Sequence, residues 1–70
     1  MTVAERAALI AGWDDKTLRA MTQASWDNYW KIADYPNHPD RAARWQATNQ
    51  YCDALLARTG ESPEDRPVRV

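Results

Sequence analysis

The large apolar side chains of this sequence are mostly aromatic, and every aromatic ring ends in a polar group. There are four tryptophans and three tyrosines but no phenylalanine. Because an indole N–H or a phenol O–H needs a partner or water, such rings suit contacts that stay partly exposed to solvent better than a fully buried core. Trp is also enriched, with Tyr, at the energetic centres of protein interfaces. The aromatic set is therefore the first candidate for a binding surface.

The chain is short and has neither of the usual supports of a small fold. Seventy residues make one domain at most, in the size range where a single core is marginal. The single cysteine, Cys52, excludes an internal disulfide, and the single histidine, His38, leaves no Cys/His set for a structural zinc. We expect no metal and no cofactor.

Charge and hydropathy disfavour two classes of partner. Nine basic and ten acidic residues give a net charge of −1, so the chain has no overall attraction to nucleic acid or to an anionic bilayer. The apolar runs are too short to span a membrane, and no segment resembles a secretory signal. These features predict a cytoplasmic protein with no membrane contact.

Capping residues and helix breakers divide the chain into three predicted helices. Thr2 and Glu5 form a capping box before a short helix over about 3 to 11, which Gly12 ends. Asp14 is the expected N-cap of a second helix that runs to about residue 34, before the Tyr35-Pro36 pair. After a turn with two prolines, capped by Asn37 or His38, a third helix is expected over about 39 to 58.

These helices predict an all-α fold, a small up-down three-helix bundle with a short first helix. We assign residues 1–60 to this domain. The charged, proline-broken segment 61–70 contains no core pattern, so we expect a disordered, flexible C-terminal tail. The predicted inward faces, at steps of three and four, are as follows: Val3, Ala7 and Ile10 in the first helix, and Trp45, Thr48, Cys52, Leu55 and Leu56 in the third.

The second helix has an apolar arc that is wider than one neighbour can cover. At about 100° per residue, this arc extends from Met21 through Leu18 to Trp26 and Trp30 at its far edge. Arg19 is expected between the two tryptophans, where its guanidinium would lie against a ring. On the third helix, Tyr51 lies beside a stripe of alanines that would let another helix approach closely. We predict a partner-binding face formed by Arg19, Trp26, Trp30 and Tyr51.

The sequence contains no convincing catalytic arrangement. His38 and Asp40 are close in sequence, but a role in the turn explains both. Cys52 lies on the predicted core seam, where cysteine acts as a small apolar residue. Asp14 and Asp15 are explained by helix capping without a metal. We therefore predict a protein that is not an enzyme and has no small-molecule substrate.

Binding another protein is the function that these features favour, by occlusion or by scaffolding. The partner is another protein or a second copy in a homodimer. The preference for arginine over lysine and the many alanines suggest a GC-rich genome, and an inhibitor or accessory protein of a phage or mobile element is one hypothesis. Two alternatives remain open: a small nucleic-acid-associated regulator using Arg41, Arg44 and Trp45 near Trp30, and an accessory subunit of a larger enzyme.

Overall fold

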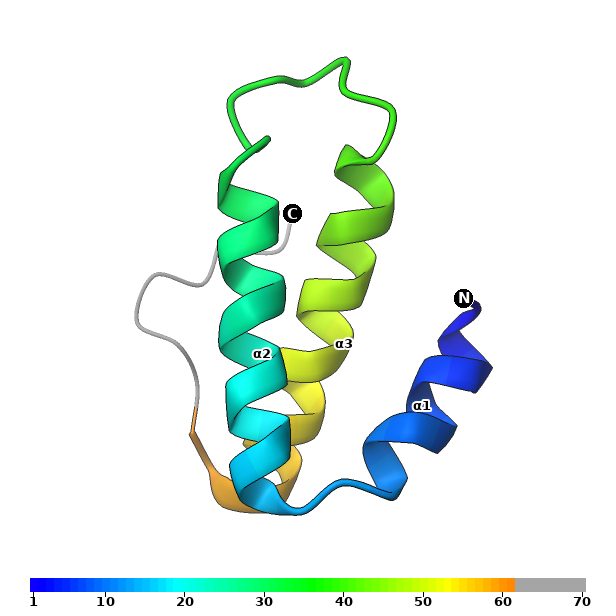
Figure 1. Ribbon diagram of the computed structural model, residues 1–70, viewed down its shortest axis with the longest axis vertical. Coiled ribbons are helices and arrows are strands. Elements are labelled where there is room, and N and C mark those ends of the chain that lie inside the picture. The colour runs from blue at the N-terminus through cyan, green and yellow to red at the C-terminus, as the bar shows by residue number, and fades with distance from the viewer. Residues whose placement is uncertain (62–70) are drawn as a thin grey trace.

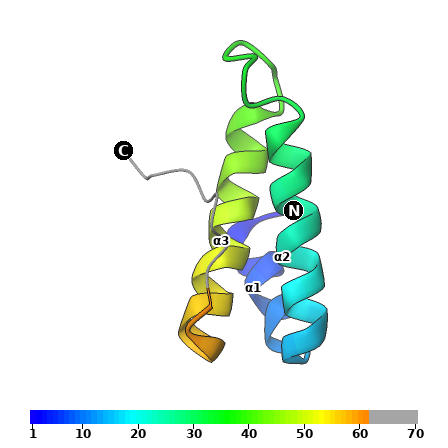
Figure 2. The ribbon, with the colours of Figure 1, turned by 90° about the vertical axis from the view of Figure 1, so that its left-hand side faces the viewer.

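The computed structural model describes residues 1–61, which form three α-helices. These are α1 (Val3–Ala11), α2 (Asp15–Trp30) and α3 (Arg41–Thr59). Helices α2 and α3 lie side by side as an antiparallel hairpin, and α1 slants away from it beside the lower half of α3 (Figures 1 and 2). The all-α, three-helix fold predicted from the sequence is confirmed. Of the predicted tail, only Glu61 falls within the described residues.

Local capping chemistry sets the starts of the first two helices. The Thr2 hydroxyl accepts the Glu5 backbone N–H at 3.1 Å, and the Glu5 carboxylate accepts the Thr2 N–H at 3.0 Å. At the start of α2, the Asp14 carboxylate accepts the Thr17 N–H at 2.7 Å. Each cap pairs backbone donors that have no partner inside the helix, and both predicted caps are confirmed.

The hairpin loop starts earlier and ends later than the sequence predicts. Helix α2 ends at Trp30, not near residue 34, because the chain tightens into turns in which the Ile32 N–H bonds the Tyr29 carbonyl at 3.0 Å. These turns bury Ile32. Helix α3 begins at Arg41, after Asp40 donates its N–H to His38 Nδ1 at 3.1 Å. His38 therefore supports the start of α3 from just outside it.

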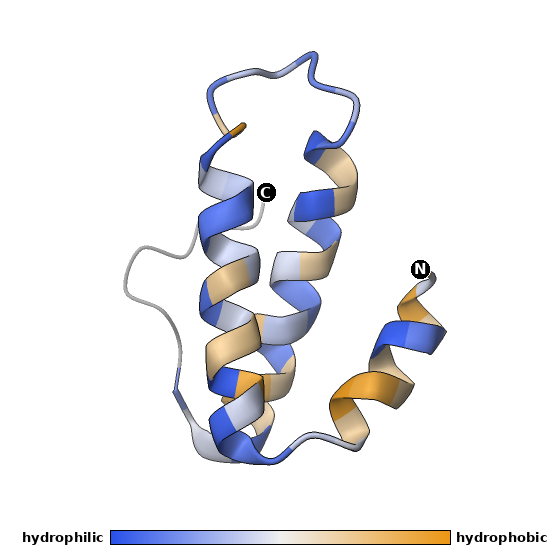
Figure 3. Cartoon of the chain, viewed as in Figure 1, coloured by the Kyte–Doolittle hydropathy of each residue, from blue (hydrophilic) through white to orange (hydrophobic). Residues whose placement is uncertain are grey.

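The lower end of the molecule contains the main aliphatic cluster. Ile10, Leu18 and Leu55 come from α1, α2 and α3 respectively, and Trp13 and Tyr51 pack against them. Figure 3 shows hydrophobic residues on α1 and near the lower ends of α2 and α3, whereas the loop joining the hairpin is mostly hydrophilic. This cluster joins all three helices.

A pair of hydroxyl groups crosses the middle of the hairpin. Thr48, which is fully buried, donates its hydroxyl hydrogen to the Ser25 carbonyl at 3.0 Å. The Ser25 and Thr48 hydroxyl oxygens are also 3.0 Å apart, so Ser25 donates to Thr48. Because buried hydroxyls need partners, this arrangement allows two polar side chains inside the α2–α3 interface.

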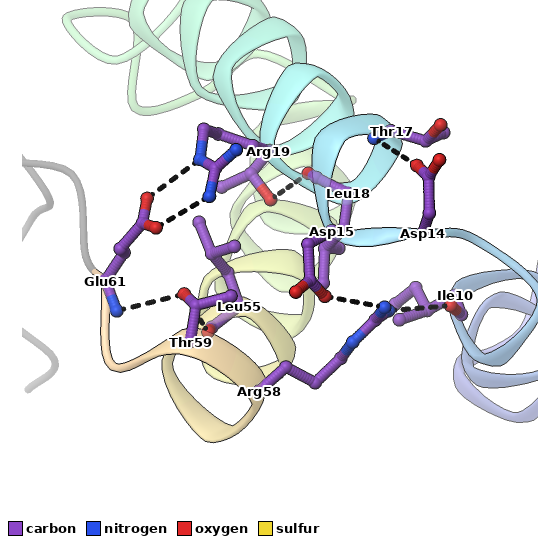
Figure 4. Close-up of polar contacts among 11 residues, drawn as sticks. Ile10, Asp14, Asp15, Thr17, Leu18, Arg19, Leu55, Arg58, Thr59 and Glu61 are labelled. Carbon is purple, nitrogen blue, oxygen red and sulfur yellow. Dashed lines mark hydrogen bonds and ion pairs between the residues drawn. The ribbon is translucent and has the colours of Figure 1, made fainter.

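Polar contacts at both ends attach α1 to α3. Gln50 donates to the Val3 carbonyl at 2.8 Å and accepts from Arg6 at 2.8 Å. At the other end, Arg58 donates to the Ile10 carbonyl at 3.4 Å and forms an ion pair with Asp15 at 2.8 Å (Figure 4). A helix of nine residues is too short to be stable alone, and these contacts supplement the burial of Ile10.

The predicted inward faces are partly wrong. In α1 the buried residues are Arg6 and Ile10, whereas Val3 and Ala7 are exposed. In α3, Thr48, Cys52 and Leu55 are buried as predicted, Trp45 is half-buried, and Leu56 is exposed. Helix α1 packs mainly against α3 and scarcely against α2, so it needs a narrower buried face than a full bundle member.

The two glycines that end helices differ in backbone conformation, and this difference predicts opposite effects of alanine. Gly60 has φ of 76° and no atom near its would-be Cβ, so Gly60→Ala should lose about 1 to 2 kcal/mol of unfolding free energy from backbone strain alone. Gly12 has φ of −87° and room for a methyl group, so Gly12→Ala should be neutral or stabilising by up to about 1 kcal/mol. Urea denaturation measures both, and equal losses would contradict the assignment.

Candidate functional site

A cluster of aromatic rings occupies the upper half of the hairpin. On α2, Trp26 stacks on Tyr29 with ring centroids 6.2 Å apart and meets the edge of Trp30 at 5.7 Å. Tyr29 reaches across to Trp45 of α3 at 5.2 Å. The Arg41 guanidinium lies over the Tyr29 ring at 5.8 Å. These rings form the core of this half of the molecule.

The prediction that Trp26 contacts a partner is wrong, because its side chain is 0% exposed. The wide apolar arc of α2 predicted more surface than two short neighbouring helices could cover. The aromatic rings cover one another instead, since Tyr29 and Trp30 both lie against Trp26. Trp30 remains 44% exposed at the edge of the cluster, and Tyr35 in the following loop is 64% exposed.

Arg19 does not lie between the two tryptophans. Its Nε and Nη2 donate to the two carboxylate oxygens of Glu61 at 2.8 and 2.7 Å (Figure 4). The Glu61 backbone N–H also bonds the Thr59 hydroxyl at 3.1 Å. Arg19 therefore ties Glu61, just after α3, to the side of α2. Local sequence patterns do not indicate this pair, because Glu61 lies 42 residues after Arg19 in the sequence.

A concave surface lies between α1 and the hairpin. It has a volume of about 430 Å³ and receives residues from all three helices. We call it the three-helix groove. Its described lining residues are Met1 before α1 and Arg6 of α1, then Met21, Ala24, Ser25 and Asn28 of α2, and Arg44, Ala47 and Tyr51 of α3.

Tyr51 is the predicted partner-binding residue that the structure places in this groove. Its ring stacks on Trp13 at 5.8 Å and has the Arg6 guanidinium 6.0 Å from its centroid. The alanine stripe predicted beside Tyr51 consists of Ala43, Ala47 and Ala54. Ala47 lines the groove with Tyr51, whereas Ala43 is exposed and does not line it. The structure thus separates Tyr51 from Trp30, which is not among the residues lining the groove.

Arg6 is a residue of the groove that the sequence analysis missed. It is only 8% exposed, and it donates to Gln50 without forming an ion pair with any residue in 1–61. The i, i+4 spacing of Arg6 and Ile10 was an available signal. That spacing alone does not predict the burial of Arg6, because an arginine on a short helix is normally solvated.

The remaining candidate groups have structural explanations. Cys52 is fully buried in the hairpin interface. Arg41 donates to the Ala33 carbonyl at 3.3 Å and Arg44 to the Asn28 carbonyl at 2.8 Å, so each arginine of the proposed nucleic-acid surface has a backbone partner. Arg44 also lines the three-helix groove. Within residues 1–61 no cluster of three or more His, Cys, Asp or Glu side chains could hold a metal ion.

No helix in the described part of the chain is long and apolar enough to cross a membrane. Comparison of the chain with protein families, with curated proteins and with solved structures finds no match. The geometry of the described residues is therefore the basis for any functional proposal.

The contrast between two neighbouring tryptophans gives a direct test of the aromatic cluster. Trp26→Ala removes a fully buried indole and should cost about 3 to 5 kcal/mol of unfolding free energy, or prevent folding. Trp30→Ala removes a half-exposed ring and should cost about 1 kcal/mol or less. Chemical denaturation followed by circular dichroism measures both. Similar losses at the two positions would contradict the burial of Trp26.

The Arg19–Glu61 pair predicts a loss of stability in acid. Hydrogen bonds from Arg19, together with its charge, lower the pKa of Glu61 below the ordinary value. A carboxylate with a lowered folded-state pKa stabilises the fold above the unfolded pKa of about 4.3, and this contribution is lost as the pH falls through the folded value. A carbon-detected NMR titration of Glu61 should show the depressed pKa in the wild type and the ordinary value in Arg19→Gln. Arg58→Gln, which breaks another ion pair, should leave the Glu61 pKa unchanged.

Proposed function

We propose that this chain is a non-catalytic protein-binding module whose partner places one helix in the three-helix groove. The observation that carries the proposal is the groove itself, an opening of about 430 Å³ lined by all three helices. Helix α1 packs on α3 and scarcely on α2 (Figure 1), and the groove is lined from all three helices by the residues named above. The bound helix would either block its parent protein's own contacts or hold that protein in place.

The residues lining the groove suit a helix in particular. Small side chains at Ala24, Ser25 and Ala47 let another backbone approach, and helices pack at axial distances of about 8 to 10 Å depending on the side chains between them. Met1 and Met21 add flexible, polarizable surface that adapts to different apolar side chains. This combination supports the recognition mode in which an amphipathic helix lays its apolar face into a groove.

The exposed ring of Trp30 is a separate candidate surface. Counting along α2, Trp30 lies about 180° from Met21 and so on the opposite flank of the helix. A flat edge with one half-exposed indole offers less concave area than the groove. We therefore assign the principal contact to the groove and keep Trp30 as a control position.

The proposal includes a setting and a mode of action. We infer that the protein works in the cytoplasm as an inhibitor or a scaffold, and its single cysteine is compatible with a reducing compartment. A second copy in a homodimer is the alternative occupant of the groove.

Selection from a displayed library of amphipathic helices, with the whole chain as bait, tests the proposal. Recovered peptides should lose binding to Ala47→Trp, in which an indole fills the groove, and keep binding to Ala57→Trp on the exposed face of α3. Ala24→Trp blocks the groove from α2 if Ala47→Trp does not fold. Peptides that bind both tryptophan variants but lose binding to Trp30→Ala would move the site to the aromatic flank and overturn the proposal.

A further inference from the structure

We propose that the helix bound in the three-helix groove is acidic, with two carboxylates seven residues apart that pair with Arg6 and Arg44. The inference rests on the proposed function, since it names the chemistry of the partner for the same groove. Three observations support it: a buried arginine without a carboxylate, a second arginine beside the same groove, and the distance between them along α3.

Arg6 is the first observation. Its side chain is almost fully buried, yet within residues 1–61 its contacts are one hydrogen bond to Gln50, at 2.8 Å, and the face of the Tyr51 ring. Arginine is rarely buried unless it is paired with an opposite charge, because removing a cation from water is costly. Within residues 1–61 no buried side-chain nitrogen lacks a hydrogen bond, so the guanidinium nitrogens that do not bond Gln50 reach the solvent. Because Arg6 lines the groove, an anion bound there would pair with them.

Arg44 is the second observation. One of its terminal nitrogens donates to the Asn28 carbonyl at 2.8 Å, and the other forms a long ion pair with the exposed Asp40 carboxylate at 3.9 Å, beyond hydrogen-bond distance. None of the described residues that line the groove is acidic. The groove therefore combines two cations with a neutral, small-residue surface, and it complements a negative partner.

The spacing of the two cations is the third observation. Arg6 lies over Tyr51, and Tyr51 is seven residues after Arg44 on α3. Seven residues are about two helical turns, or roughly 10.5 Å along the axis. A second helix lying along α3 presents residues i and i+7 at the same separation and on one face. Its residues i+3 and i+4 would then face Ala47 and Ser25, so an apolar side chain there is expected.

Defined peptides test this chemistry. The probe is a fluorescein-labelled, alanine-rich peptide of about 15 residues, long enough to have helical tendency, with Glu at i and i+7 and Leu at i+3 and i+4. One control peptide has Gln at both acidic positions, and a second has both Glu residues moved to the opposite face. Fluorescence anisotropy with the whole chain should give a Kd at least about tenfold lower for the first peptide, as expected for charge-assisted hydrogen bonds.

Protein variants assign the effect to the arginines. Arg44→Gln should weaken the Glu peptide about tenfold and leave the Gln peptide unchanged, whereas Arg19→Gln, outside the groove, should change neither. Arg6→Met should weaken the Glu peptide while keeping or raising the unfolding free energy, because it replaces a buried cation by an apolar chain of similar length. A thermal melt of each variant checks that it is folded.

The outcomes separate this inference from the proposed function. If the Glu and Gln peptides bind equally and Ala47→Trp blocks both, the groove binds helices but the acidic inference is overturned. If none of the three peptides binds at millimolar concentration, the acidic inference is also overturned, and the library selection alone decides the proposed function. If sedimentation shows a dimer that Ala47→Trp dissociates, a second copy occupies the groove and the acidic helix is excluded.

Discussion

The packing of α2 against α3 is the interaction on which the other features depend. It closes the aromatic cluster at the upper end through Tyr29 and Trp45, and it brings Leu18 against Leu55 at the lower end. Helix α1 contributes Ile10 to that lower cluster but otherwise rests on α3 through polar contacts. The molecule is thus a hairpin with a third helix attached to one side. The groove exists because α1 alone does not cover the whole packing surface of α3.

The helix limits were largely predictable, and the buried faces were predictable only in part. Caps at Thr2 and Asp14 and the left-handed Gly60 depend on chemistry within a few residues, so the sequence contains what is needed to place them. Burial also depends on partners from other helices. Trp26 is partly covered by Tyr29 and Trp30, three and four residues further along α2, and the Tyr29 ring in turn meets Trp45 of α3. Arg19 pairs with Glu61, 42 residues later, and local periodicity gives no signal of that contact.

The same reasoning explains why Arg6 was overlooked and why it matters. A periodic pattern counts arginine as polar, yet the side chain is long enough to cover an aromatic face and still reach an acceptor, as Arg6 does with Tyr51 and Gln50. A designer seeking stability alone would choose an apolar residue there. Arg6 thus helps attach α1 to α3 and lines the three-helix groove at the same time.

The hydroxyl pair of Ser25 and Thr48 has a consequence for how the hairpin is aligned. Stacked rings and aliphatic side chains tolerate sliding, so apolar packing alone would permit neighbouring alignments of α2 along α3. A shift of one turn, about 5.4 Å, would separate the two hydroxyls and break the bond from Thr48 to the Ser25 carbonyl. The hydroxyl pair thus selects one alignment of α2 along α3, much as a single buried asparagine fixes the register of a coiled coil.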